Sequence, residues 1–77
     1  MTLVEFIDNF ADLFDETDRD TISASTRYKE LAEWSSLLAL SVIAMIDEEY
    51  DVEFRGDDIR CSNTVEDLFN IVEARVG

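Results

Sequence analysis

Residues that interrupt helices are almost missing from this chain, which has no proline and only two glycines, Gly56 and Gly77. Proline and glycine are the residues that most often break regular structure, so long helices can form with few interruptions. No internal repeat, low-complexity tract or linker is present. A chain of 77 residues buries only about 60 % of the surface that its unfolded form exposes. We therefore expect an all-α fold with one domain spanning residues 1–77.

The first helix is predicted near the N-terminus. Thr2 is suited to cap it, and Glu5 three residues later completes the capping-box pattern. Apolar residues then recur at helical spacing and define one buried face. That predicted face consists of Leu3, Phe6, Ile7, Phe10, Leu13 and Phe14.

A long loop is predicted from Asp15 to Glu33, where the helical periodicity lapses and Asp, Ser and Thr dominate. Loops of this length in compact domains are often functional. We expect Ile22, Tyr28 and Leu31 to attach it to the core, with a short helical turn near Tyr28.

The second half of the chain predicts three further helical pieces. One runs from about Ser36 to Tyr50, and a short turn lies within the polar segment 51–63, at 57–59. The last begins after Thr64, which forms a second capping-box pattern with Asp67. Its apolar face consists of Val65, Leu68, Ile71 and Val72. The prediction is thus three long helices and one short one.

Charge restricts the partners of the chain, because 19 acidic residues against six basic ones give a net charge of −13. Nucleic acids and anionic membranes are excluded, since both require a basic face. Basic patches on proteins would be attracted, and that attraction would weaken as salt rises. The alternative is that acidity serves only solubility.

Several chemistries are excluded by composition. Without histidine there is no Ser-His pair and no imidazole to activate Cys61, so we expect no catalytic residues and no enzyme activity. Cys61 is the only cysteine, which excludes an internal disulfide and a cysteine-based zinc site. We expect it to be inert and partly covered. The segment 15–20 lacks the central glycine of a calcium loop, so no metal site is predicted.

The N-terminus has no basic region followed by an apolar run, and no stretch approaches the length of a membrane span. We therefore expect a cytoplasmic protein, with no membrane partner.

The predicted second helix carries two separate apolar stripes. Ala39, Ile43, Ile46 and Tyr50 form the stripe expected to face the bundle. Leu37, Leu40 and Ala44 form the other, flanked by Ser41, Asp47 and Glu48. The second stripe indicates a docking surface whose leucines would each gain about 1.5–3 kcal/mol when a partner covers them. The alternative is that this helix is buried nearly all round.

Ser35 and Ser36 stand where the same helix begins. Such serines usually cap the helix by accepting hydrogen bonds from the free amides of its first turn. The same position would also favour an attached phosphate, which would lie at the positive end of the helix dipole. Capping and phosphate attachment both remain open at this point.

The run from Glu33 to Val52, EWSSLLALSVIAMIDEEYDV, resembles the second helix of acyl carrier proteins. In that family the motif Asp-Ser-Leu opens the helix, and three acidic residues and an aromatic close it. Here the opening reads Ser35-Ser36-Leu37, and residues 47–50 read Asp-Glu-Glu-Tyr. The resemblance extends to the first helix, the long loop and the start of the last helix, and so covers essentially the whole chain.

This resemblance implies a four-helix bundle of the acyl carrier type, acting as a monomer. A phosphopantetheinyl transferase would attach 4′-phosphopantetheine from coenzyme A to Ser36, and acyl groups would be held on it as thioesters. Acyltransferases and ketosynthase-type enzymes with basic patches would be the other partners. The resemblance places the partner surface at Leu37, Leu40, Ala44, Asp47 and Glu48. It places the acyl cavity at Ile46, Phe54, Ile59 and Leu68.

The chain departs from the family pattern at four positions. Ser35 replaces the Asp of the motif, Trp34 stands where a small residue is usual, and Leu38 and Ser41 replace residues that are often acidic. These differences favour a carrier specialised for its own enzymes, in a secondary lipid, polyketide or surface-glycan pathway, over one for fatty acid biosynthesis. Ser35 also keeps open an alternative function, a carrier-like adaptor that binds proteins without a prosthetic group.

Overall fold

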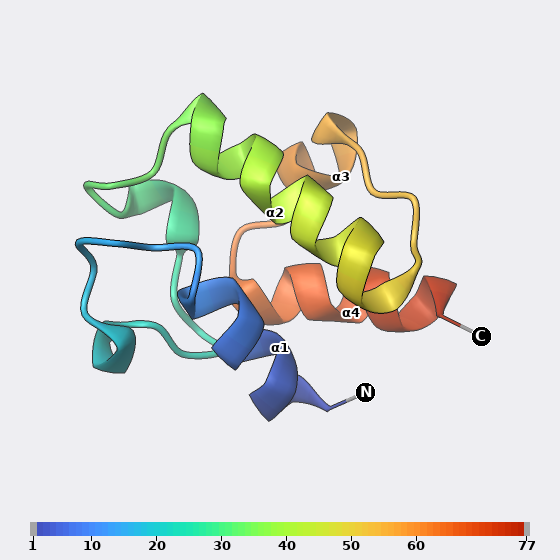
Figure 1. Ribbon diagram of the computed structural model, residues 1–77, viewed down its shortest axis with the longest axis horizontal. Coiled ribbons are helices and arrows are strands. Elements are labelled where there is room, and N and C mark those ends of the chain that lie inside the picture. The colour runs from blue at the N-terminus through green and yellow to red at the C-terminus, as the bar shows by residue number, and fades with distance from the viewer. Residues whose placement is uncertain (1, 77) are drawn as a thin grey trace.

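The computed structural model describes residues 2–76, which form four α-helices and, within that range, no strand (Figure 1). The helices are α1 (Leu3–Ala11), α2 (Ser36–Tyr50), α3 (Gly56–Arg60) and α4 (Val65–Arg75). The predicted all-α class and the number of helices are therefore confirmed.

The helices close a ring in which each packs on two others. Helix α1 contacts α2 and α4, and α3 contacts the same two helices from the other side. The radius of gyration is 11.2 Å, close to the roughly 11.5 Å expected for a compact chain of this length. The core at the centre of the ring contains side chains from all four helices and from the long loop.

The predicted N-cap of α1 is confirmed, because the Thr2 hydroxyl accepts a hydrogen bond from the Glu5 backbone N–H at 3.2 Å. The reciprocal bond of a capping box, from the Thr2 N–H to the Glu5 side chain, is not present among residues 2–76. The helix ends at Ala11, earlier than the apolar pattern predicts. The N–H groups of Leu13 and Phe14 continue the chain in a tighter turn, donating to carbonyls three residues back. Phe14 therefore stays buried although it lies outside the helix.

The loop between α1 and α2 contains two 3₁₀ turns, Arg19–Thr21 and Tyr28–Glu30. The predicted turn near Tyr28 is thus confirmed. Ile22 and Tyr28 are buried and Leu31 is half-buried against the core, as expected for residues that attach the loop.

Tyr28 also provides a polar anchor inside the core. Its hydroxyl lies 2.7 Å from the Ser62 hydroxyl, which in turn donates to the Ile59 carbonyl at 3.0 Å. Both side chains are fully buried, and burial raises the pKa of Tyr28. Because these polar groups satisfy one another, the loop is attached to the end of α3 without an unpaired group in the core.

The loop is also hydrogen-bonded to the start of α4. The backbone N–H groups of Val65 and Glu66 donate to the carbonyls of Thr26 and Ala24, at 3.1 and 2.9 Å. Two amides that a helix start normally leaves free are therefore used to fix the loop.

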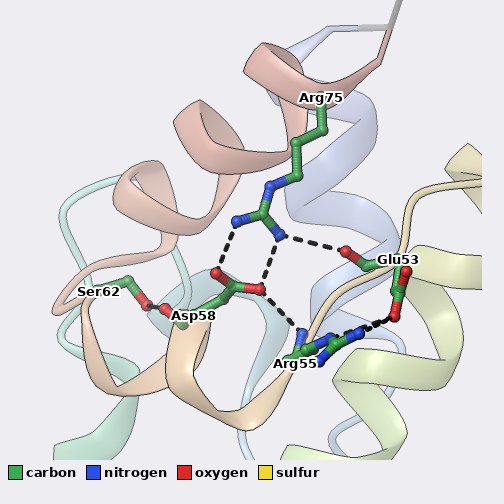
Figure 2. Close-up of polar contacts among 5 residues, drawn as sticks. All are labelled: Glu53, Arg55, Asp58, Ser62 and Arg75. Carbon is green, nitrogen blue, oxygen red and sulfur yellow. Dashed lines mark hydrogen bonds and ion pairs between the residues drawn. The ribbon is translucent and has the colours of Figure 1, made fainter.

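The far end of α4 is linked to α3 by a charged network (Figure 2). The Arg75 guanidinium forms two hydrogen bonds of 2.7 Å to the Asp58 carboxylate and a third of 3.2 Å to the Glu53 carbonyl. Asp58 also accepts from the Arg55 backbone N–H at 2.9 Å. The hydrogen bonds from Arg75 and Arg55 hold the pKa of Asp58 below its ordinary value.

The buried side of α2 differs from the predicted one. Val42, Met45 and Ile46 are its buried residues, whereas Ala39, Ile43 and Tyr50 are only partly buried. All four residues of the predicted stripe pack in or against the core, but the prediction was incomplete, since it omitted Val42 and Met45. The reason is that α2 packs against α1 on one side and α3 on the other, so a wider arc faces the ring.

Candidate functional site

The candidate site lies at the N-terminal end of α2, and the chain entering it is fixed by Glu33. The Glu33 carboxylate accepts hydrogen bonds from the backbone N–H groups of Asp15, Glu16 and Thr17, at 2.8–3.0 Å, and from the Thr17 hydroxyl. Burial raises the pKa of Glu33, but these hydrogen bonds lower it by more. The start of the long loop is thereby tied to its end.

Trp34 is the second residue that fixes this entry. Its ring lies 4.9 Å from that of Tyr28 in an edge-to-face arrangement and stacks on Phe14 at 6.4 Å. Such pairs add about 0.5–1.5 kcal/mol beyond the area that they bury. The backbone is therefore anchored on the aromatic core immediately before Ser35.

The two serines at the start of α2 have different positions. Ser35 is the N-cap, and its hydroxyl accepts a hydrogen bond from the Leu38 backbone N–H at 3.3 Å. Ser36 is the first helical residue and is exposed. Among residues 2–76 its hydroxyl has no hydrogen-bond partner. The capping role that the sequence left open thus belongs to Ser35.

The first turn of α2 keeps donors available for a ligand. The N–H groups of Ser36 and Leu37 belong to the first helical positions, which have no carbonyl partner within the helix. The helix dipole adds partial positive charge at this end, and the first turn contains no acidic residue. A phosphate group bonded to the Ser36 hydroxyl would meet these amides.

The outer face of α2 is apolar and open. Leu37 and Leu40 are 74 % and 63 % exposed, and Ala44 beside them is exposed as well. Asp47 and Glu48 are exposed further along the same helix. The expected second stripe is therefore a surface stripe, and the alternative of a helix buried nearly all round is wrong.

A surface hollow of about 400 Å³ adjoins Ser36 on the α3 side. It is lined by Ser36, Ala39, Leu40, Ile43, Gly56, Ile59 and Arg60. A Cβ atom added at Gly56 would meet nothing within 4 Å, so the hollow is open at that position. An apolar chain attached at Ser36 can rest in it.

The four residues expected to form an acyl cavity all lie in the core. Ile46 and Leu68 have no exposed surface, and Phe54 and Ile59 are less than 8 % exposed. Only Ile59 also lines the hollow beside Ser36. The site that the structure brings together therefore includes Gly56 and Arg60, which the sequence analysis missed.

The acidic residues at the end of α2 have no internal counterions. None of Asp47, Glu48 and Glu49 forms an ion pair within the described range 2–76. The six cations of the chain are in contact elsewhere. Five arginines pair with Asp8, Glu30, Glu53, Asp57 and Asp58, and Lys29 bonds the Arg60 carbonyl. The acidic end of α2 is thus available to positive charge from a partner.

Three other features of the described residues bear on function. No group of three or more potential metal ligands gathers within residues 2–76, and no helix there is long and apolar enough to cross a membrane. Cys61 is exposed rather than partly covered, because it follows the last residue of α3 and points away from the core that Ile59 enters.

No family model, curated protein or solved structure matches the chain.

Proposed function

We propose that this protein is an acyl carrier protein in which Ser36 bears a covalent 4′-phosphopantetheine arm. The observation that carries the proposal is the separation of roles at the start of α2. Ser35 caps the helix, which leaves the Ser36 hydroxyl exposed and unbonded among the described residues. A serine that is a substrate for a transferase must be accessible in this way.

The local chemistry suits a phosphodiester at Ser36. The free amides of Ser36 and Leu37, together with the helix dipole, favour negative charge at this position. Ser35 supports the proposal although it differs from the Asp of the family motif, since Ser and Asp are comparable N-caps. The capping role of the motif is therefore kept while one negative charge is lost.

The arm would supply a terminal thiol on which acyl groups are held as thioesters. The hollow beside Ser36 offers the apolar surfaces of Ala39, Ile43 and Ile59 to the arm or to a short acyl chain. A longer chain would have to part the closely packed side chains of Ile46 and Leu68, which have no exposed surface. The bundle of the acyl carrier type would then have to open.

Partner enzymes would bind the outer face of α2. Leu37, Leu40 and Ala44 supply apolar contact area, while Asp47 and Glu48 attract basic patches and speed encounter. The proposed partners are a phosphopantetheinyl transferase, acyltransferases and ketosynthase-type enzymes. The pathway would be a specialised lipid, polyketide or surface-glycan pathway in the cytoplasm.

The decisive experiment is incubation with coenzyme A and a phosphopantetheinyl transferase, followed by intact-mass measurement. We expect the mass to rise by one phosphopantetheinyl group, and Ser36→Ala to abolish the gain. Ser35→Asp is the matched control, because it keeps the cap and restores the family motif. That variant should be modified at least as fast as the natural sequence.

A carrier-like adaptor without a prosthetic group is the alternative that this experiment separates. If neither the natural chain nor Ser35→Asp gains mass with several transferases, the carrier proposal is wrong. Modification of Ser35→Asp alone would instead identify the lost charge as the feature that converts a carrier into an adaptor.

A further inference from the structure

A second groove, between α1 and α2, lies on the other side of the outer α2 face from the hollow beside Ser36. It is lined by Asn9, Asp12, Leu13, Ser41, Ala44, Met45, Glu48 and Glu49. Leu13, Ala44 and Met45 form its apolar floor, and three carboxylates border it. We call it the α1–α2 groove. It shares only Ala44 and Glu48 with the proposed partner surface of α2.

The charge of this groove is not balanced by the protein. Asp12, Glu48 and Glu49 are exposed and form no ion pair among residues 2–76. Glu48 and Glu49 also lie in the last turn of α2, where the helix dipole disfavours negative charge. Carboxylates that oppose the dipole without a counterion weaken the helix, so their position is better suited to binding than to folding.

The acidic surface continues beyond this groove toward the end of α2. A neighbouring hollow is lined by Glu5, Asp8, Asn9, Glu49 and Tyr50, so the two share Asn9 and Glu49. Asp8 is the one member of this surface that is neutralised, by Arg19. The two hollows therefore adjoin at Asn9 and Glu49, and acidic residues border both of them.

From the apolar floor and the unbalanced charge we propose that the α1–α2 groove binds a basic amphipathic helix of a partner protein. An apolar side chain of the partner helix would cover Leu13 and Met45. Lys or Arg side chains beside it on the same helix would form ion pairs with Asp12 and Glu49. A second copy of this chain is a poor occupant, because both copies carry a charge of −13. The mode is an amphipathic helix lying in a groove.

This inference does not depend on the arm, because the groove is complete whether or not Ser36 is modified. Its test can therefore use the unmodified chain. If Ser36 is not modified, the groove proposal is unaffected. If the peptide does not bind in the groove, the proposed modification of Ser36 is unaffected.

The probe is a synthetic helical peptide with Leu at every third or fourth position and Lys elsewhere, titrated into the ¹⁵N-labelled full chain. We expect the largest amide shifts in residues 9–13 and 41–49. A scrambled peptide of the same composition, which has the same charge but no apolar face, should bind more weakly. Affinity should fall as salt rises.

Matched variants separate the groove from the overall charge. Asp12→Asn with Glu49→Gln removes two charges at the groove and should weaken peptide binding about fivefold. Glu66→Gln with Glu73→Gln removes two charges from exposed positions of α4 and should weaken it less than about twofold. Thermal unfolding of each variant establishes that it is folded.

Two results would overturn the proposal. One is an equal loss of affinity in both double variants, which would mean that only net charge matters. The other is amide shifts confined to residues 36–40 and 56–60, which would place the peptide on the α3 side.

Discussion

Helices α4 and α2 differ in the charged residues and caps at their ends. Helix α4 starts with a reciprocal capping box between Thr64 and Asp67, has acidic residues in its first turn, and ends with Arg75. Helix α2 has no acidic residue in its first turn and no basic residue in its last. The backbone of its C-cap, Asp51, has the left-handed conformation. Helix α4 thus has charges that complement its dipole at both ends, while α2, although capped by Ser35, has none at either end.

Under the proposed function, this difference would mark the place where binding is favoured over stability. The amides at the start of α4 donate to the long loop, whereas those of Ser36 and Leu37 at the start of α2 have no backbone acceptor among residues 2–76. The acidic end of α2 opposes its own dipole but provides the charge that a basic partner would meet. If this comparison is correct, stabilising α2 should be easy, and stabilising α4 should be difficult.

The largest expected effect is the loss of the α4 cap. Thr64→Ala should lower the free energy of unfolding by about 1.5 kcal/mol, because the Asp67 backbone N–H loses its acceptor. Ser36→Ala at the start of α2 should change it by less than about 0.5 kcal/mol, since that exposed hydroxyl makes no hydrogen bond among residues 2–76. Urea unfolding measures both, and equal losses would contradict the comparison.

A somewhat smaller gain is expected at the other end of α2. Asp51 has a φ of 54° and a ψ of 44°, which glycine adopts without strain. Asp51→Gly should therefore raise the free energy of unfolding by about 1 kcal/mol. Asp47→Gly, inside the helix, should lower it by about 0.5 kcal/mol. Two changes of the same sign would show that conformation at Asp51 is not the cause.

Because the helix dipole is positive at the N-terminus and negative at the C-terminus, the same charge reversal should have opposite effects at the two ends. Glu49→Lys in the last turn of α2 should stabilise the protein by about 0.5 kcal/mol. Glu66→Lys in the first turn of α4 should destabilise it by a similar amount. Both side chains are exposed, so thermal unfolding at low salt reports the dipole term. Both changes in the free energy of unfolding should become smaller when salt is added, because salt screens the charges.

The smallest expected effect is in pH dependence. Hydrogen bonds from the Asn63 and Thr64 amides lower the pKa of Asp67. A carboxyl whose pKa is lowered by folding stabilises the protein above its unfolded pKa, and that contribution is lost as pH falls through the folded value. Asp67→Asn should therefore destabilise the protein at about pH 7 and have less effect near about pH 3. A destabilisation that is the same at both pH values would contradict this account.

Local patterns in the sequence predicted much of the fold. The bounds of α2, the caps at Thr2 and Thr64, and the burial of Ile22 and Tyr28 all follow from neighbours a few residues apart. The position of Ser35 and Ser36 at the start of α2 was predicted from the same kind of local pattern. Helix caps and turn chemistry act within one turn of chain, so they are legible without a structure.

The features that were missed join distant parts of the chain. Glu33 bonds amides 16 to 18 residues away, and Arg75 bonds Asp58 across 17 residues. The central positions of α2, Val42 and Met45, are buried because α1 and α3 approach from two sides. Periodicity along one helix cannot indicate which other helices it contacts. The hollow beside Ser36 and the α1–α2 groove therefore could not be predicted from the sequence, since both depend on the positions of α1 and α3.

Trp34 gives the molecule a built-in optical reporter. It is the only tryptophan of the chain, it is half-buried, and it stands two residues before Ser36. Its emission depends on the packing of Phe14 and Tyr28 around the indole, so events at the start of α2 that disturb this packing will change its intensity or wavelength. The proposed modification of Ser36 and the proposed partner binding could thus be tested in real time without a dye.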